Sequence, residues 1–73
     1  MKELKQALES EIDTRKYKIL YEECRELNNG GYSQFDRDYA LRAAKDELID
    51  DLHSVFKDEN VILIFENLIE SIR

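Results

Sequence analysis

The sequence predicts an all-α protein: a small three-helix bundle with a long N-terminal helix, or four helices if that first helix is kinked. The chain has 73 residues, no proline and only two glycines, which are adjacent at Gly30 and Gly31. Apolar residues recur at three- and four-residue spacing in each of three segments, as on one face of a helix. A chain of this length holds one core, so residues 1–73 are expected to form a single domain.

The first segment, residues 2 to about 28, carries two apolar stripes whose centres lie roughly 150° apart at about 100° per residue. One stripe contains Leu4, Leu8, Ile12 and Ile19, and the other contains Tyr17, Leu20, Tyr21, Cys24 and Leu27. A break near Asp13-Thr14 would let each half pack separately, since either residue can cap a new helix. We favour one continuous helix, because no glycine or proline interrupts it.

A continuous first helix would pack one end on its own core and offer the other to a second chain. We therefore expect self-association as a homodimer, the commonest closed oligomer. The residues expected to take part are Leu4, Leu8, Ile12, Ile19 and Leu63.

The second helix is predicted from Gln34 to Phe56, after the break at Asn28-Asn29-Gly30-Gly31. Glycine or asparagine closes helices by adopting the left-handed conformation, and Ser33 can cap the next helix. Asp36 suits the first turn, although a capping box prefers Glu or Gln at that position. The apolar stripe of this helix contains Leu41, Ala44, Leu48, Leu52, Val55 and Phe56, with Ile49 beside it.

The last segment is the most apolar, and its periodicity favours a helix over a strand. Its predicted face contains Val61, Ile64, Phe65, Leu68, Ile69 and Ile72. Ile62 widens this face, whereas Leu63 lies well outside its centre. Asp58 or Asn60 can cap the helix after the polar turn at residues 57–60.

The net charge of −6 and the single cysteine limit what the protein can do. Nucleic acid and anionic membranes would be repelled, whereas basic protein surfaces would be attracted. Cys24 alone cannot form a disulfide within the chain, and the first residues hold no hydrophobic signal region. We expect a cytoplasmic protein.

Four carboxylates on the second helix are predicted to lie opposite its apolar stripe: Asp46, Glu47, Asp50 and Asp51. Their i,i+4 spacing places like charges one turn apart, which costs a few tenths of a kcal/mol. Such rows can stand in for the phosphates of nucleic acid, or can simply be a solvated helix face.

Other candidate sites are weaker. Aromatic residues at the start of the second helix could anchor a partner or cover the end of the bundle; these are Tyr32, Phe35 and Tyr39. Asp50 and His53 have a spacing found in metal-binding bundles, but one histidine is too few for such a site. Cys24 and His53 lack the neighbours that catalysis needs. We expect no enzyme activity, no metal and no cofactor.

Two functions remain for a protein of this kind. In the first, the acidic face docks on a basic surface of another protein and blocks it, as a DNA mimic, in replication, transcription or defence. The composition is typical of phage or mobile-element proteins of this type. In the second, the protein is a structural or adaptor subunit that assembles through apolar helix faces.

Overall fold

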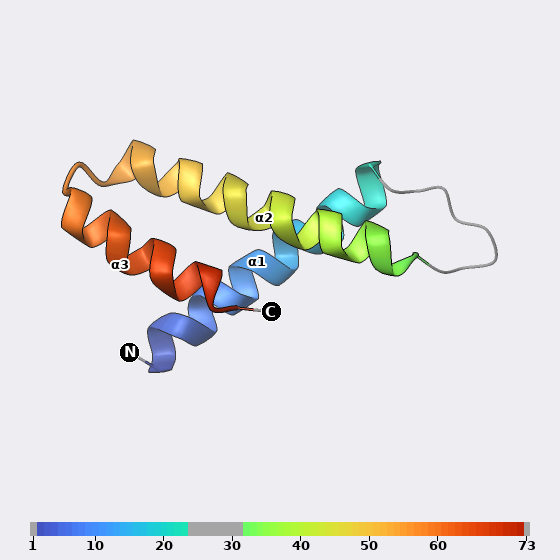
Figure 1. Cartoon of the computed structure of the whole chain (residues 1–73), viewed down its shortest axis with the longest axis horizontal. Helices are drawn as coiled ribbons and strands as arrows, with labels where there is room; N and C mark the ends of the chain where they lie inside the picture. Colours follow the sequence, from blue (N-terminus) through green and yellow to red (C-terminus); the bar gives the residue numbers. More distant parts are fainter. Residues whose placement is uncertain (1, 24–31, 73) are drawn as a thin grey trace.

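The computed structural model describes residues 2–23 and 32–72, and these form three helices and no strand. Helix α1 spans Lys2–Glu23, α2 spans Gln34–Val55 and α3 spans Glu59–Glu70. Helix α3 folds back beside the second half of α2, and α1 crosses both (Figure 1). The molecule measures 45 × 24 × 15 Å along its principal axes. The all-α prediction is confirmed.

Helix α1 runs without a break through Asp13 and Thr14. The Thr14 hydroxyl donates to the carbonyl oxygen of Ser10 at 3.0 Å, so it bonds within the helix and caps no new one. The preference for one continuous helix is therefore confirmed over Lys2–Glu23. Its predicted end near residue 28 and the Asn28–Gly31 break lie outside the described residues.

Helix α2 begins with a complete capping box. The Ser33 hydroxyl accepts from the Asp36 amide at 3.1 Å, and the Asp36 carboxylate accepts from the Ser33 amide at 3.2 Å. Asp36 thus performs the role that Glu or Gln usually fills. The helix ends at Val55, where Phe56 is the C-cap and its amide donates to the Leu52 carbonyl at 2.8 Å.

Helix α3 starts at Glu59 because Asp58 caps it, accepting from the Asn60 amide at 2.9 Å. Of the two predicted caps, Asp58 is the one used. The rings of Phe56 and Phe65 stack across the α2–α3 corner with their centroids 5.4 Å apart. This contact fixes the direction in which α3 returns along α2.

The core lies where the three helices meet, and two of its large side chains, Ile12 and Ile69, are fully buried. The buried residues of this central cluster are Leu8, Ile12, Ile19, Leu20, Ala40, Ala44, Leu48, Ile69 and Ile72. The two stripes predicted on the first helix are not separate surfaces. Leu20 joins Ile19 in the core, while Tyr17 and Tyr21 are exposed.

Two details of the predicted apolar faces are wrong. Val55 is 70% exposed, because it is the last residue of α2 and lies where the chain turns away. Ile64 is 52% exposed, and Ile62 is buried in its place. Residues two apart on a helix point about 200° apart, so α3 cannot bury both against the same neighbours.

Lys45 is the one charged residue that is buried among the described residues. It lies next to Ala44 in the middle of α2. A lysine in such a position packs its methylene stem on apolar neighbours while the ammonium reaches water. The four-carbon stem therefore serves as a core side chain, which the apolar pattern of the sequence did not indicate.

Candidate functional site

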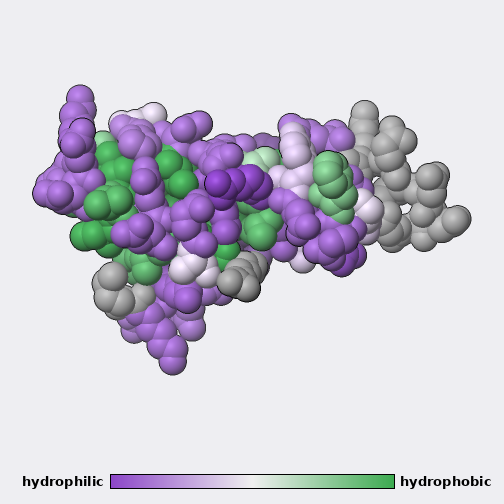
Figure 2. Space-filling model, viewed as in Figure 1, coloured by the Kyte–Doolittle hydropathy of each residue, from purple (hydrophilic) through white to green (hydrophobic). Residues whose placement is uncertain are grey.

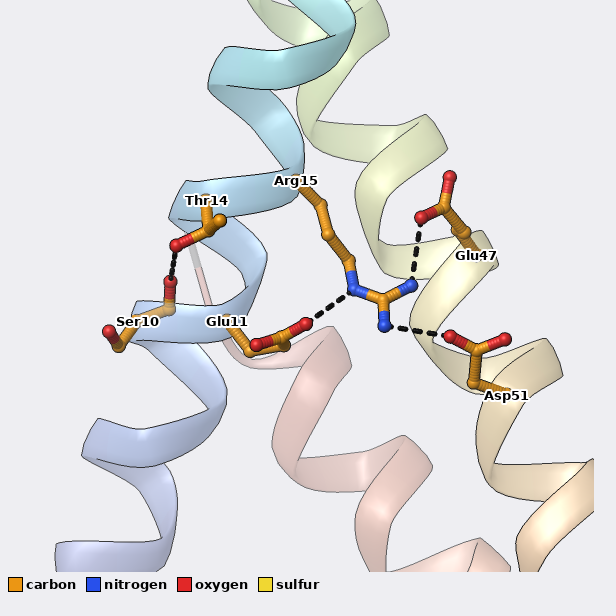
Figure 3. Close-up of polar contacts among 6 residues, drawn as sticks. All are labelled: Ser10, Glu11, Thr14, Arg15, Glu47 and Asp51. Carbon is orange, nitrogen blue, oxygen red and sulfur yellow. Dashed lines mark hydrogen bonds and ion pairs between the residues drawn. The ribbon is translucent and has the colours of Figure 1, made fainter.

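The most organised polar feature is a cluster of three carboxylates around the guanidinium of Arg15 (Figure 3). Arg15 Nε lies 2.8 Å from Glu11 Oε1, Nη1 lies 2.8 Å from Glu47 Oε1, and Nη2 lies 2.7 Å from Asp51 Oδ2. Glu11 belongs to α1, and the other two carboxylates belong to α2. We call these four residues the Arg15 cluster. It joins the two longest helices and keeps a net charge of −2, because three carboxylates surround one cation.

The surroundings of Arg15 change its pKa in two opposing ways. Burial lowers the pKa, but hydrogen bonds and charge interactions with Asp51 and Glu11 outweigh it and raise the pKa above the ordinary arginine value. The guanidinium is therefore charged at every physiological pH. Its side chain is only 19% exposed, whereas those of Glu47 and Asp51 are each 56% exposed. The cluster thus presents its negative groups outward and its positive group inward.

The four carboxylates predicted as one acidic face do not form a single free face. Glu47 and Asp51 lie at the boundary with α1, where Arg15 holds them. Asp46 lies 3.9 Å from Arg42, and Asp50 has no ion pair within the described part of the chain. The helix turns by about 100° per residue, so neighbours in sequence such as Asp50 and Asp51 point in different directions.

Arg42 forms a second, more exposed cluster that links α2 to α3. Its Nη1 donates to both carboxylate oxygens of Glu70, at 3.1 and 3.2 Å. These hydrogen bonds, followed by the charges of Glu70 and Asp46, raise the pKa of Arg42. Two carboxylates face one guanidinium here, so this Arg42 cluster also keeps an excess of negative charge.

The corner between α2 and α3 combines exposed aliphatic side chains with carboxylates. Val55, Leu63 and Ile64 are each more than half exposed there. Leu63 also lines an open groove of about 370 Å³, together with His53, Glu59, Asn60, Ile62 and Glu66. Figure 2 shows hydrophobic atoms gathered over this end of the molecule. We call this feature the corner groove.

The predicted aromatic anchors lie at the other end of α2. Phe35 is 78% exposed and Tyr39 is 48% exposed, whereas Tyr32 is half-buried. The Tyr39 hydroxyl donates to Glu23 Oε2 at 3.0 Å, which ties α2 to the end of α1. Phe35 is thus the most accessible of the three, and their role in binding stays a prediction.

Most residues predicted for self-association are used within the single chain. Leu8, Ile12 and Ile19 are buried in its core, and Leu4 packs partly against that core. Only Leu63 is exposed, at 54%. Of the residues predicted for self-association, Leu63 is therefore the one most available to a second copy.

Of the residues weighed for a metal or catalytic site, the structure describes Asp50 and His53. His53 Nε2 lies 3.1 Å from Glu66 Oε1 on α3, not beside Asp50. Within residues 2–23 and 32–72, no three His, Cys, Asp or Glu side chains gather as a metal site would require. Cys24 lies outside the described residues. In the same described part, no helix is both long enough and apolar enough to cross a membrane.

Searches with the sequence and the structure found no matching family model, no matching curated protein and no matching solved structure. The function is therefore inferred from the surfaces of the molecule. Sequence reasoning missed Arg15, which organises the larger of the two clusters. The i,i+4 spacing of Glu11 and Arg15 was a local signal for one ion pair, but the contacts to Glu47 and Asp51 cross between helices and leave no such signal.

Proposed function

We propose that this protein is a non-enzymatic binding module that docks on a basic surface of another protein and blocks it. The observation that carries the proposal is the Arg15 cluster, which holds three carboxylates from two helices around one half-buried cation. Their outward faces are half exposed, so a cationic partner can reach them. The surface type that fits best is one that otherwise holds the phosphates of nucleic acid.

Fixed carboxylates suit this role better than mobile ones. A charged side chain loses rotamer freedom when it binds, which costs about 0.5–1.5 kcal/mol for each side chain immobilised. Glu47 and Asp51 already have their positions set by hydrogen bonds to Arg15. They therefore lose less on binding than free surface carboxylates, while the excess negative charge of the cluster still attracts cations.

The Arg42 cluster extends the same surface chemistry to α3. Asp46, Asp50 and Glu70 are all exposed, and Arg42 is the one cation among the described residues that pairs with any of them, at Asp46 and Glu70. Electrostatic complementarity of this kind speeds association and selects partners by charge. It predicts a binding affinity that falls steeply as salt is added, since the Debye length shortens from about 10 Å at 0.1 M to 3 Å at 1 M.

The test is a pull-down from the source cell, followed by affinity measurements on the captured protein. The variant D46K/D50K reverses two exposed carboxylates without touching the Arg15 cluster. The matched control is E3K/E9K, which changes the net charge equally at two exposed α1 positions with no ion pair in the described structure. We expect D46K/D50K to weaken binding at least tenfold at 0.1 M salt and E3K/E9K to change it less than threefold. Equal losses of affinity in both variants would show that only the net charge matters, and would reject the proposed docking face.

A second function is favoured by the corner groove. Its exposed aliphatic side chains would suit an adaptor subunit that assembles through apolar helix faces. Because Glu59 and Glu66 line the groove, the occupant that fits is an amphipathic helix with basic residues beside its apolar ones. A complex of this type would persist at 1 M salt and fail in L63S/I64S, whereas acidic-face docking would show the opposite pattern.

A further inference from the structure

A second pocket lies between α1 and α2, far along α2 from the corner groove. It has a volume of about 250 Å³ and is lined by Lys16, Tyr17, Leu20, Tyr32 and Arg37. We call it the cationic pocket. Among the described residues, two cations, two phenol rings and one buried leucine line it, and no carboxylate does. In a chain with 17 acidic and 11 basic residues, that local composition is opposite to the average.

The carboxylates nearest to Arg37 in sequence are engaged elsewhere. Asp36 accepts from the Ser33 amide in the capping box, and Asp38 accepts from the Gln34 side chain at 3.0 Å. Arg37 makes no ion pair with any of the described residues, although its neighbours on both sides are acidic. Its planar fork of donors is therefore available to an anion.

Lys16 is held over the pocket's aromatic wall. Its Nζ lies 4.9 Å from the centroid of the Tyr17 ring, in cation–π geometry. Its one carboxylate neighbour in the described structure is Asp13, at 3.6 Å, which is long for a charge-assisted hydrogen bond. A doubly charged anion that also reaches Arg37 would compete well with this single, loosely placed carboxylate.

The lining indicates the class of ligand. Two cations favour a dianion, and arginine binds phosphate through two parallel hydrogen bonds. Tyr17, Tyr32 and Leu20 offer flat and apolar surfaces to a ring. The volume is below the roughly 300–1,000 Å³ typical of pockets for drug-sized ligands, so the bound part is the size of a side chain or a small head group.

We propose that the cationic pocket binds a phosphate monoester whose organic part carries an aromatic ring. The phosphate lies with Lys16 and Arg37, and the ring packs on Tyr17 and Tyr32. The proposal does not depend on the acidic docking face, because it uses other residues and a ligand of opposite charge.

The experiment is a calorimetric titration of the full chain with phenyl phosphate at pH 7.5 and low salt, with inorganic phosphate and phenol as reference probes. We expect one saturable site for phenyl phosphate, at least tenfold weaker binding of inorganic phosphate, and no binding of phenol. The variants R37Q and K16Q should each weaken binding at least tenfold. The matched control K18Q, at an exposed α1 position outside the lining, should change it less than twofold.

Two further probes distinguish the sources of this chemistry. Tighter binding of adenosine 5′-monophosphate would indicate a nucleotide, and tighter binding of O-phosphotyrosine would indicate a modified side chain. Absence of saturation with phenyl phosphate would overturn the proposal. So would equal affinity for inorganic phosphate, or equal losses in K18Q and R37Q. Circular dichroism of R37Q checks that the variant is folded. R37K keeps the charge but lacks the guanidinium fork, so its affinity for phenyl phosphate should lie between those of the wild type and R37Q.

Discussion

The two ends of α2 present different chemistry although they belong to one helix. Near Val55 the exposed apolar residues are aliphatic, and the adjacent groove is lined by Glu59 and Glu66. Near Phe35 they are aromatic, and the adjacent pocket is lined by Lys16 and Arg37. Figure 2 shows the larger hydrophobic area at the α2–α3 corner and a smaller one near the start of α2.

This difference shows that the net charge predicts which partners the whole molecule attracts, but it does not predict which ligand suits each local site. A charge of −6 predicts attraction to basic surfaces, which suits the corner and the middle of α2. At the other end, the carboxylates of Asp36 and Asp38 accept hydrogen bonds from Ser33 and Gln34 and do not pair with Arg37. Lys16 and Arg37 are therefore the charged groups that line the small pocket there. A partner at one end and an anion at the other are therefore compatible.

The largest effect should come from breaking the core that both ends share. Ile12→Ala removes a fully buried side chain beneath the α1–α2 contact and should cost about 2–5 kcal/mol. The whole domain is expected to have roughly 4–11 kcal/mol of stability at 0.05–0.15 kcal/mol per residue. Urea unfolding followed by circular dichroism measures the change. Leu63→Ala is the matched control: its side chain is exposed, so its effect should stay within about 0.5 kcal/mol.

The second largest effect should separate the two ends as binding surfaces. L63S/I64S removes two exposed aliphatic side chains at the corner, each worth about 1.5–3 kcal/mol when fully buried against a partner. If the corner contacts the partner, affinity falls at least tenfold. F35S/Y21S, at the aromatic end, should leave that affinity within threefold. The reverse pattern would make the aromatic end the docking surface.

The same variant tests the predicted homodimer. Leu8, Ile12 and Ile19 are buried in the single chain, so Leu63 is the predicted self-association residue that a second copy can reach, and we expect the dimer contact at the corner around it. Sedimentation equilibrium of the wild-type chain should then show a dimer that L63S/I64S dissociates. A wild-type chain that stays monomeric up to millimolar concentration would contradict the dimer without affecting the other proposals.

The sequence predicted the elements well because the signals for helices are local. Apolar spacing predicted three helices, Ser33 was predicted as a cap, and the cap of the last helix was narrowed to Asp58 or Asn60, of which Asp58 is used. The faces were predicted less well. Ile62 and Ile64 are equally apolar, and only the position of α3 against its neighbours decides which is buried.

The candidate functional surfaces were predicted only in part, because local sequence signals do not show how the helices pack against one another. Asp46, Glu47, Asp50 and Asp51 could be recognised as a row of carboxylates in α2. That Arg15 would bind two of them depends on the packing of α1 across α2, between residues more than thirty positions apart, as for Arg15 and Glu47. The cationic pocket likewise joins residues of α1 and α2 with Tyr32, which precedes α2, and no local pattern in the sequence indicates that they meet.

A third, smaller effect concerns the middle of α2, where the Arg15 cluster lies between the two ends. Arg15→Gln removes three partly exposed ion pairs of about 0.2–1 kcal/mol each and leaves their carboxylates to repel, so we expect a loss of about 1–2 kcal/mol. The raised pKa of Arg15 means that its contribution is complete below the ordinary arginine pKa and is lost only as pH rises past the folded-state value. The difference between variant and wild type should therefore be constant from pH 7 to pH 10. Lys18→Gln is the control with the same charge change, and a similar loss in that variant would assign the effect to net charge.

The smallest effects should come from the N-caps of α2 and α3, Ser33 and Asp58, and they compare the starts of those two helices directly. Ser33→Ala removes the hydroxyl that accepts from the Asp36 amide but keeps the backbone amide that donates to the Asp36 carboxylate, and Asp58→Ala removes the carboxylate that accepts from the Asn60 amide. Each change thus breaks one capping hydrogen bond, and because loss of an N-cap side chain costs about 0.5–2 kcal/mol, both should lie near 1 kcal/mol. Asp58→Ala also removes a negative charge from the positive end of the α3 dipole, a contribution that salt screens. Urea unfolding at 0.05 and 1 M salt should thus show the Asp58→Ala loss shrinking with salt while the Ser33→Ala loss holds. Equal salt responses would mean that Asp58 acts only through its hydrogen bond.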